Sequence, residues 1–171
     1  MATSVSSLIG VDFNNPSSTA LFGLGTEALG TQASQWTYCV ATGTLTTGQL
    51  VAIFPAGTAY AFTTALLNGG DTAGTTGNLN LGAIQTYCAQ GSYAWVARKG
   101  YDMYVATTGT MTPSTNVGFS PTAGGICTAG LVAVGQTAAG IFITTSASTA
   151  TAATAKATLQ YPRAMVGVPQ S

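Results

Sequence analysis

Short runs of alternating apolar and polar residues fill much of the chain after position 34. In YAWVAR, residues 93–98, Tyr93, Trp95 and Ala97 fall on one face of an extended strand, and the three residues between and after them fall on the other. The following Gly100 is expected to close a tight turn, and the alternation resumes over residues 101–105. The pattern therefore predicts two strands joined as a β-hairpin over residues 93–107.

Similar runs bounded by Gly, Pro or Asn predict further short strands at 36–41, 50–54, 59–63, 79–87, 126–134, 141–145 and 157–161, the last ended by Pro162. The segments 66–77 and 108–125 are rich in turn formers and predict loops, and we also interpret the Ala/Thr/Ser-rich stretch 144–158 as a loop. The chain shows about ten short strands and no helical period, so it is expected to be all-β, a small β-barrel or β-sandwich with an extended N-terminal arm. The sequence contains no repeat of fixed period, so we do not expect a propeller or a solenoid.

Residues 1–34 differ from the rest of the chain, because Ser, Thr, Asn and Gly predominate and apolar residues are scattered. We interpret 1–34 as the extended N-terminal arm and 35–171 as a single β-barrel or β-sandwich domain. The arm is too sparse in apolar side chains for its own core, so it should dock on a neighbouring subunit or another protein. A chain without residues 2–30 should then still fold. The candidate contact residues are Leu8, Ile9, Phe13, Leu21 and Phe22.

Charged residues make up 5% of the chain, against about 25% in an average soluble domain, and the formal net charge is zero. No stretch is basic enough to follow a phosphate backbone, so no nucleic-acid partner is expected. The apolar runs are too short to span a bilayer, and the N-terminus lacks the features of a secretory signal, so no membrane partner is expected. The surface must consist mainly of hydroxyl, amide and backbone groups, which repel other copies only weakly.

The acid–base inventory of the chain is small. There is no histidine, which removes the usual base for a serine or cysteine nucleophile. No phosphate-binding glycine motif occurs, and the four carboxylates are dispersed along the sequence at Asp12, Glu27, Asp71 and Asp102. We therefore expect no catalytic residues, no cofactor and no enzymatic activity.

The three cysteines show no CxxC spacing, and without histidine a fourth zinc ligand is hard to find. No metal site is expected. We interpret the cysteines as small buried thiols of a chain that folds in a reducing cytoplasm, and a disulfide between two of them is the alternative. The residues are Cys39, Cys88 and Cys127.

Aromatic residues occupy alternate positions in two of the expected strands, which is typical of a core. The alternative is a platform on which sugars stack, extended by Tyr101 and Tyr104. The expected core residues are Trp36, Tyr38, Tyr93 and Trp95.

Several motifs follow one another in the order found in a known family. FGLGT (22–26) and QWTYCVA (35–41) resemble an opening of the form lGT … W-x-Y-V-x-A, and TLTTGQLVAI (44–53) resembles i-x-x-G-x-x-V-a-i. LGAIQ (81–85) with GSYAWV (91–96) resembles v-G-V-a-q … G-x-Y-G-W-V, although Ala94 stands where glycine is common. GGICT (124–128) and LQYP (159–162) fit the last strands. Over residues 22 to 163 this order is similar to that of the capsid decoration (cement) proteins of tailed bacteriophages.

The resemblance implies a virion structural protein without catalysis, which binds the outer surface of the phage head and stabilises the shell. It implies the major capsid protein as partner, a homotrimer, and synthesis in the host cytoplasm. A protein that binds only the assembled shell stabilises it by mass action. The alternative from another class is a tail- or fibre-associated β module that binds a receptor or glycan.

Overall fold

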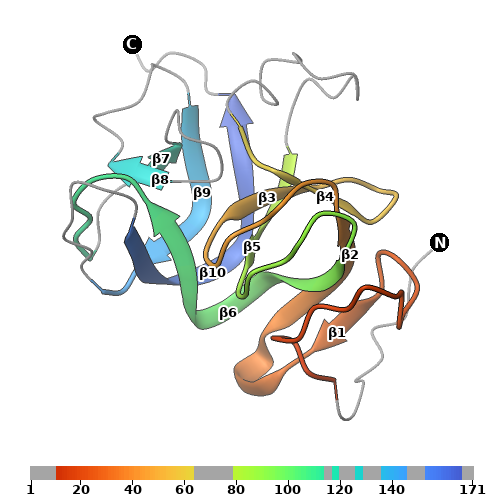
Figure 1. The fold of residues 1–171 in the computed structure, drawn as a ribbon. Coiled ribbons are helices and arrows are strands. Elements are labelled where there is room, and N and C mark those ends of the chain that lie inside the picture. Colours follow the sequence, from red (N-terminus) through yellow and green to blue (C-terminus); the bar gives the residue numbers. More distant parts are fainter. Residues whose placement is uncertain are drawn as a thin grey trace.

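The computed structural model describes residues 11–63, 79–113, 117–119, 126–128, 136–145 and 153–166 (Figure 1). The all-β prediction is confirmed. The predicted loop at 66–77 lies outside the described residues, and the predicted loop at 108–125 contains a strand. The elements are β1 (Glu27–Leu29), the 3-10 turn η1 (Thr31–Ala33), β2 (Gln35–Ala41), β3 (Leu50–Ile53), β4 (Thr58–Ala61), β5 (Leu79–Ile84), β6 (Tyr93–Thr107), β7 (Val117–Phe119), β8 (Ile126–Thr128), β9 (Gln136–Ile143) and β10 (Ala153–Val166).

Five strands pair in a closed ring, here called ring A. Strand β2 pairs with β6 along one side and, at residues 40–41, with β4 in parallel. Strand β4 pairs with β3, β3 pairs with β5, and β5 returns to β6. Ring closure pairs the edges that an open sheet would leave free. Strand β1 lies outside the ring, antiparallel to the first half of β2.

A second closed ring, ring B, uses the other end of β6. Strand β6 pairs with β10, β10 with β9, β9 with β7 and β7 with β8. The ring closes where Thr107 of β6 pairs with Ile126 of β8. Strand β6 is therefore common to both rings, and Figure 1 shows it as the long green ribbon that bends between them. Strands β5 and β10 also pair with each other, at residues 79–80 and 163–164.

Alternation along the strands supplies two hydrophobic clusters. The larger cluster holds buried residues of β2, β3, β5 and the first half of β6, Trp95 and Ala97 among them, together with the buried side chains of ring B. The smaller cluster takes residues from every strand of ring A: Cys39, Ala41, Leu45, Val51, Ala59, Ile84, Cys88, Ala94 and Val96. Both faces of the first half of β6 are thus buried, and a strand without a solvent face has little place for charged residues.

The hairpin predicted over residues 93–107 is wrong, because β6 is one continuous strand of 15 residues. The residues that suggested a turn form two bulges instead. Arg98 is the extra residue between the Gln35–Lys99 and Trp36–Ala97 pairs. Farther along, two residues of β6 stand opposite Thr158 of β10, and one of these two, Asp102, has a φ of 54°. The bulges bend the strand from ring A into ring B without reversing it.

The last strand is longer than predicted in both directions. Residues 153–156, interpreted as part of a loop, pair with β6, and the strand continues past Pro162 to Val166. Pro162 lies in an irregularity where three residues of β10 stand opposite the single Gly140 of β9. A proline is tolerated there because its missing N–H interrupts no ladder hydrogen bond.

The Gly140→Ala substitution tests this close approach between β9 and β10. Gly140 has a φ of +77°, and a Cβ atom there would lie 2.4 Å from the backbone oxygen of Gln160. Gly91→Ala is the matched control, since its φ is also +77° and no atom lies within 4 Å of its Cβ position. The control should cost about 1–2 kcal/mol for the left-handed backbone alone, and Gly140→Ala should cost clearly more. Equal urea midpoints for the two variants would contradict the close approach.

Candidate functional site

Six aromatic side chains form one contiguous group, here called the aromatic cluster. The Phe13 ring stacks on Trp36 with centroids 4.7 Å apart and meets the Trp95 ring edge-on at 5.5 Å. The Phe22 ring lies 5.2 Å from the rings of both Tyr38 and Trp95. Offset and edge-on contacts of this kind add to the stabilisation from burial. The members are Phe13, Phe22, Trp36, Tyr38, Tyr93 and Trp95.

The four predicted core residues lie on the same face of β2 and β6, where the register pairs Tyr38 directly with Trp95. Trp36, Tyr38 and Trp95 are buried, and Tyr93 is half-buried against the larger cluster. The buried indole of Trp36 donates a hydrogen bond to Ser34 Oγ at 3.0 Å, which in turn donates to the Thr31 carbonyl. These positions serve as core rather than as an open sugar-stacking platform.

Hydrogen bonds hold the arm against this face. Ser17 and Tyr93 exchange two backbone hydrogen bonds, of 2.9 and 2.8 Å. The Leu21 N–H donates to the Tyr38 hydroxyl at 3.1 Å, and the Gly25 N–H donates to the Tyr38 carbonyl at 2.8 Å. Residues 11–30 therefore form a strap across β2 and β6 of their own chain, visible in orange-red beside β1 in Figure 1.

This placement differs from the expectation that the arm docks only on another protein. Phe13 and Phe22 lie over the core of the same chain. Leu21 points outward and is 65% exposed. Leu8 and Ile9 lie outside the described residues. The sequence showed no period in the arm because a strap contacts the domain at isolated points, and no regular spacing marks those points.

The strap also builds an exposed strand edge, here called the leucine edge. It consists of the outer side of β1, where Glu27 and Leu29 are exposed, and of the exposed side chains of Leu21 and Leu24. The Thr26 carbonyl accepts from the Tyr38 N–H of β2, and the Gly30 N–H donates to the carbonyl of Ser34, just before β2. The backbone groups of residues 27 and 29 therefore point away from β2, and no described strand pairs with them. Leu24 and Leu29 were not among the predicted contact residues, because single leucines among glycines form no strand pattern.

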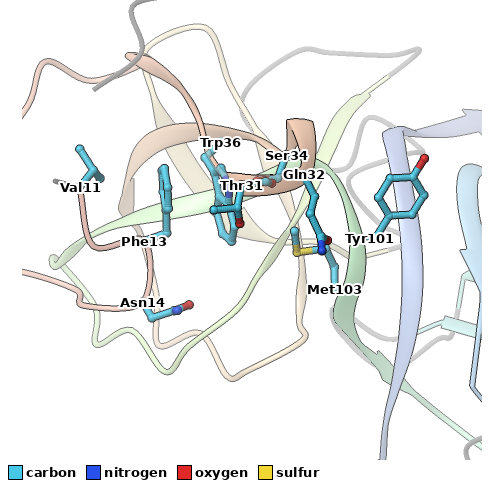
Figure 2. Close-up of a pocket in the computed structure, with 9 residues that line it drawn as sticks. All are labelled: Val11, Phe13, Asn14, Thr31, Gln32, Ser34, Trp36, Tyr101 and Met103. Carbon is cyan, nitrogen blue, oxygen red and sulfur yellow. Dashed lines mark hydrogen bonds between the residues drawn. The ribbon is translucent and has the colours of Figure 1, made fainter. Parts of the chain in front are cut away.

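A hollow of about 310 Å³ opens between the strap, η1 and β6 (Figure 2). Figure 2 shows Val11 and Phe13 at one end, Tyr101 at the other, and Gln32 beside Met103 between them. None of the described residues that line the hollow is charged. Tyr101 was predicted only as part of the alternative sugar platform, and the polar residues beside it were not predicted, because only the fold brings them together.

The described cysteines are poor nucleophiles. Burial raises the pKa of the Cys39 thiol to about 12, and the nearby Arg98 guanidinium offsets only part of that rise. Burial also raises the pKa of Cys88. Neither cysteine forms a disulfide, and because their pKa values are raised, both thiols stay protonated and unreactive near neutral pH. The side chain of Cys127 is not among those that the structure describes.

Arg98, the bulge residue of β6, is half-buried, and its guanidinium lies 5.9 Å from the centre of the Tyr161 ring. Burial lowers the pKa of Arg98, and the Glu27 carboxylate opposes that change. Among the described residues, no three His, Cys, Asp or Glu side chains lie close enough to hold a metal ion. No helix in the described ranges is long and apolar enough to cross a membrane.

The fold defines an all-β protein of two joined five-strand rings whose shared strand is covered by an N-terminal strap. No protein-family model matches the chain, and no curated protein matches it. The function must therefore be inferred from the surface and from the motifs of the chain itself.

Proposed function

We propose that this protein is a non-enzymatic virion structural protein, a capsid decoration protein that binds the outer surface of a phage head and stabilises the shell. The observation that carries the proposal is the leucine edge, an unpaired strand edge with three exposed leucines on a chain with only four basic and four acidic residues. The ordered motifs over residues 22 to 163, which resemble those of cement proteins, support the same conclusion.

The leucine edge suits a protein partner that supplies a strand. The outward N–H and C=O groups of residues 27 and 29 can form backbone hydrogen bonds with an added strand. The three leucines would then bury their side chains against that strand. We propose the major capsid protein as this partner. Binding that occurs only on the assembled shell stabilises the shell by mass action.

We also propose that the protein acts as a homotrimer on the capsid. A near-absence of charge allows copies to approach one another at little electrostatic cost. Exposed aromatic side chains on ring B, such as Tyr104 and Phe142, offer contact area away from the leucine edge. The protein would be made in the host cytoplasm and added to the capsid after assembly.

The proposal is tested on purified phage particles from which the protein has been stripped. Re-adding the protein should raise the temperature at which the particles release DNA. A Leu21→Asp/Leu24→Asp variant should bind the shell at least about tenfold more weakly, because binding would bury its carboxylates. Tyr87→Asp, which adds a charge at an exposed position outside the leucine edge and outside the proposed trimer contacts, is the matched control and should retain binding to the capsid. Unchanged DNA release, with no copies found on the shell, would overturn the proposal.

The second candidate is a receptor- or glycan-binding module on the tail or a tail fibre, favoured by the uncharged hollow beside Tyr101. Copy number separates the two candidates. Mass spectrometry of particles should find many copies relative to the major capsid protein if the protein decorates the shell, and only a few if it belongs to the tail.

A further inference from the structure

We propose that the hollow shown in Figure 2 is a binding site for a neutral saccharide. The inference goes beyond capsid decoration, and it names the ligand class that the second candidate, a glycan-binding module, would take. Its volume of about 310 Å³ lies at the small end of the range for ligand pockets, which fits one or two sugar rings.

Polar groups suited to sugar hydroxyls flank the hollow. The side-chain amides of Asn14 and Gln32 and the hydroxyl of Tyr101 line it, and none of them bonds to another described residue. An amide both donates and accepts, so it matches the paired donor and acceptor of two adjacent sugar hydroxyls. Ser34 is already engaged, because its hydroxyl bonds to both Trp36 and Thr31.

A sugar ring also has apolar C–H faces, and apolar side chains in the same hollow can pack against them. Phe13 is held in place by its stack on Trp36, and Met103 and Tyr101 add further apolar surface. The Tyr101 side chain is 60% exposed, so part of its ring is open to a ligand. Aromatic and thioether groups beside free amides are a mixture that fits a polyol ring better than a purely apolar ligand.

The absence of charge from the lining sets the ligand class. Lys99 and Asp12 line neighbouring hollows, and none of the described residues lining this one carries a charge. An anionic ligand such as a phosphate or an acidic sugar would lose water without gaining an opposite charge. A neutral saccharide loses only hydroxyl hydrogen bonds, which the amides replace.

The backbone that presents Gln32 is strained. Gln32 and Ala33 have φ values of 54° and 56°, in the left-handed region that favours glycine. Strain of this kind persists only where the surrounding structure enforces it, and it clusters at binding sites. Here the strained turn η1 places the Gln32 side chain beside Met103 (Figure 2).

Ligand-observed NMR with the methyl glycosides of glucose, galactose, mannose and N-acetylglucosamine tests the proposal. At least one of them should bind with a Kd on the order of 1 mM, as expected for a small neutral ligand. Gln32→Gly removes the amide while suiting the backbone, and Tyr101→Ala removes the open ring. Each should weaken binding about tenfold or more. Circular dichroism should show that both variants keep the fold.

Two matched controls isolate the site. Ala33→Gly changes the adjacent left-handed position, which does not line this hollow, and Tyr87→Ala removes a tyrosine of similar exposure elsewhere. Both should bind the same glycoside as the unmodified protein does. Absence of binding by all four glycosides at about 10 mM would overturn the proposal. So would undiminished binding in folded Gln32→Gly and Tyr101→Ala, or binding of sialic acid in place of the neutral sugars. None of these outcomes affects the shell-binding measurement, so the two proposals fail separately.

Discussion

Replacing Trp95 with alanine is expected to lower the free energy of unfolding by about 3–5 kcal/mol. The Trp95 side chain is 3% exposed, and its ring lies 5.0 to 5.5 Å from the rings of Tyr38, Phe22 and Phe13. Its removal leaves a cavity where the strap, β2 and β6 meet, and it deletes three aromatic contacts. Urea denaturation, followed by circular dichroism, measures the change.

Tyr87→Ala is the control for Trp95→Ala, because the Tyr87 side chain is 58% exposed. It should change the unfolding free energy by no more than about 0.5 kcal/mol. A Trp95→Ala protein that is fully stable and has lost only glycan binding would contradict the core role of Trp95. That result would instead favour the receptor-binding candidate.

Deleting residues 2–30 is expected to lower the unfolding free energy by about 5 kcal/mol or more. The deletion removes β1 and both strap aromatics, Phe13 and Phe22, and it uncovers the buried rings of β2 and β6. Domains of this size have unfolding free energies of about 5–15 kcal/mol, so the truncated chain should be marginal or unfolded. Denaturation and exposure of apolar surface to a dye report the effect.

This expected result is the opposite of the sequence-based prediction that the truncated chain still folds. The Phe13→Ala/Phe22→Ala double variant should reproduce most of the destabilisation while keeping the full chain length. A truncated protein with an unchanged urea midpoint would contradict the strap and restore the idea of an arm that docks only on a partner. Capsid binding is meaningful only for variants that prove folded.

The strand pattern of residues 93–107 shows which structural features a local sequence can predict and which it cannot. Alternation correctly assigned Trp95 and Ala97 to one face and their neighbours to the other. The alternation failed to predict the structure at Gly100, because a glycine that follows Arg98 and Lys99 is compatible with either a turn or a bulge. Whether the chain reverses or continues depends on the partner strands, and here β2 and β10 both pair across the bulges.

The candidate sites were less accessible to sequence reasoning than the core. Trp36, Tyr38 and Trp95 are large side chains at alternate strand positions, so their burial could be predicted from the sequence pattern. The hollow draws its lining from the strap, η1 and β6, which are separated by up to about ninety positions. No local spacing links Asn14 to Tyr101, and the left-handed backbone at Gln32 has no glycine to signal it.

The sequence by itself determined that this protein is all-β, with buried aromatic residues on β2 and β6. These properties follow from the period of two that a strand imposes and from the affinity of large apolar side chains for a core. Only the tertiary structure decided that the strands close into two rings on one shared strand, and that the arm folds back over its own chain. Closure and docking depend on contacts between residues far apart in sequence, such as Thr107 with Ile126 and Phe13 with Trp95. A local pattern cannot specify its distant partner, because many strands offer the same hydrogen-bonding edge and the same apolar face.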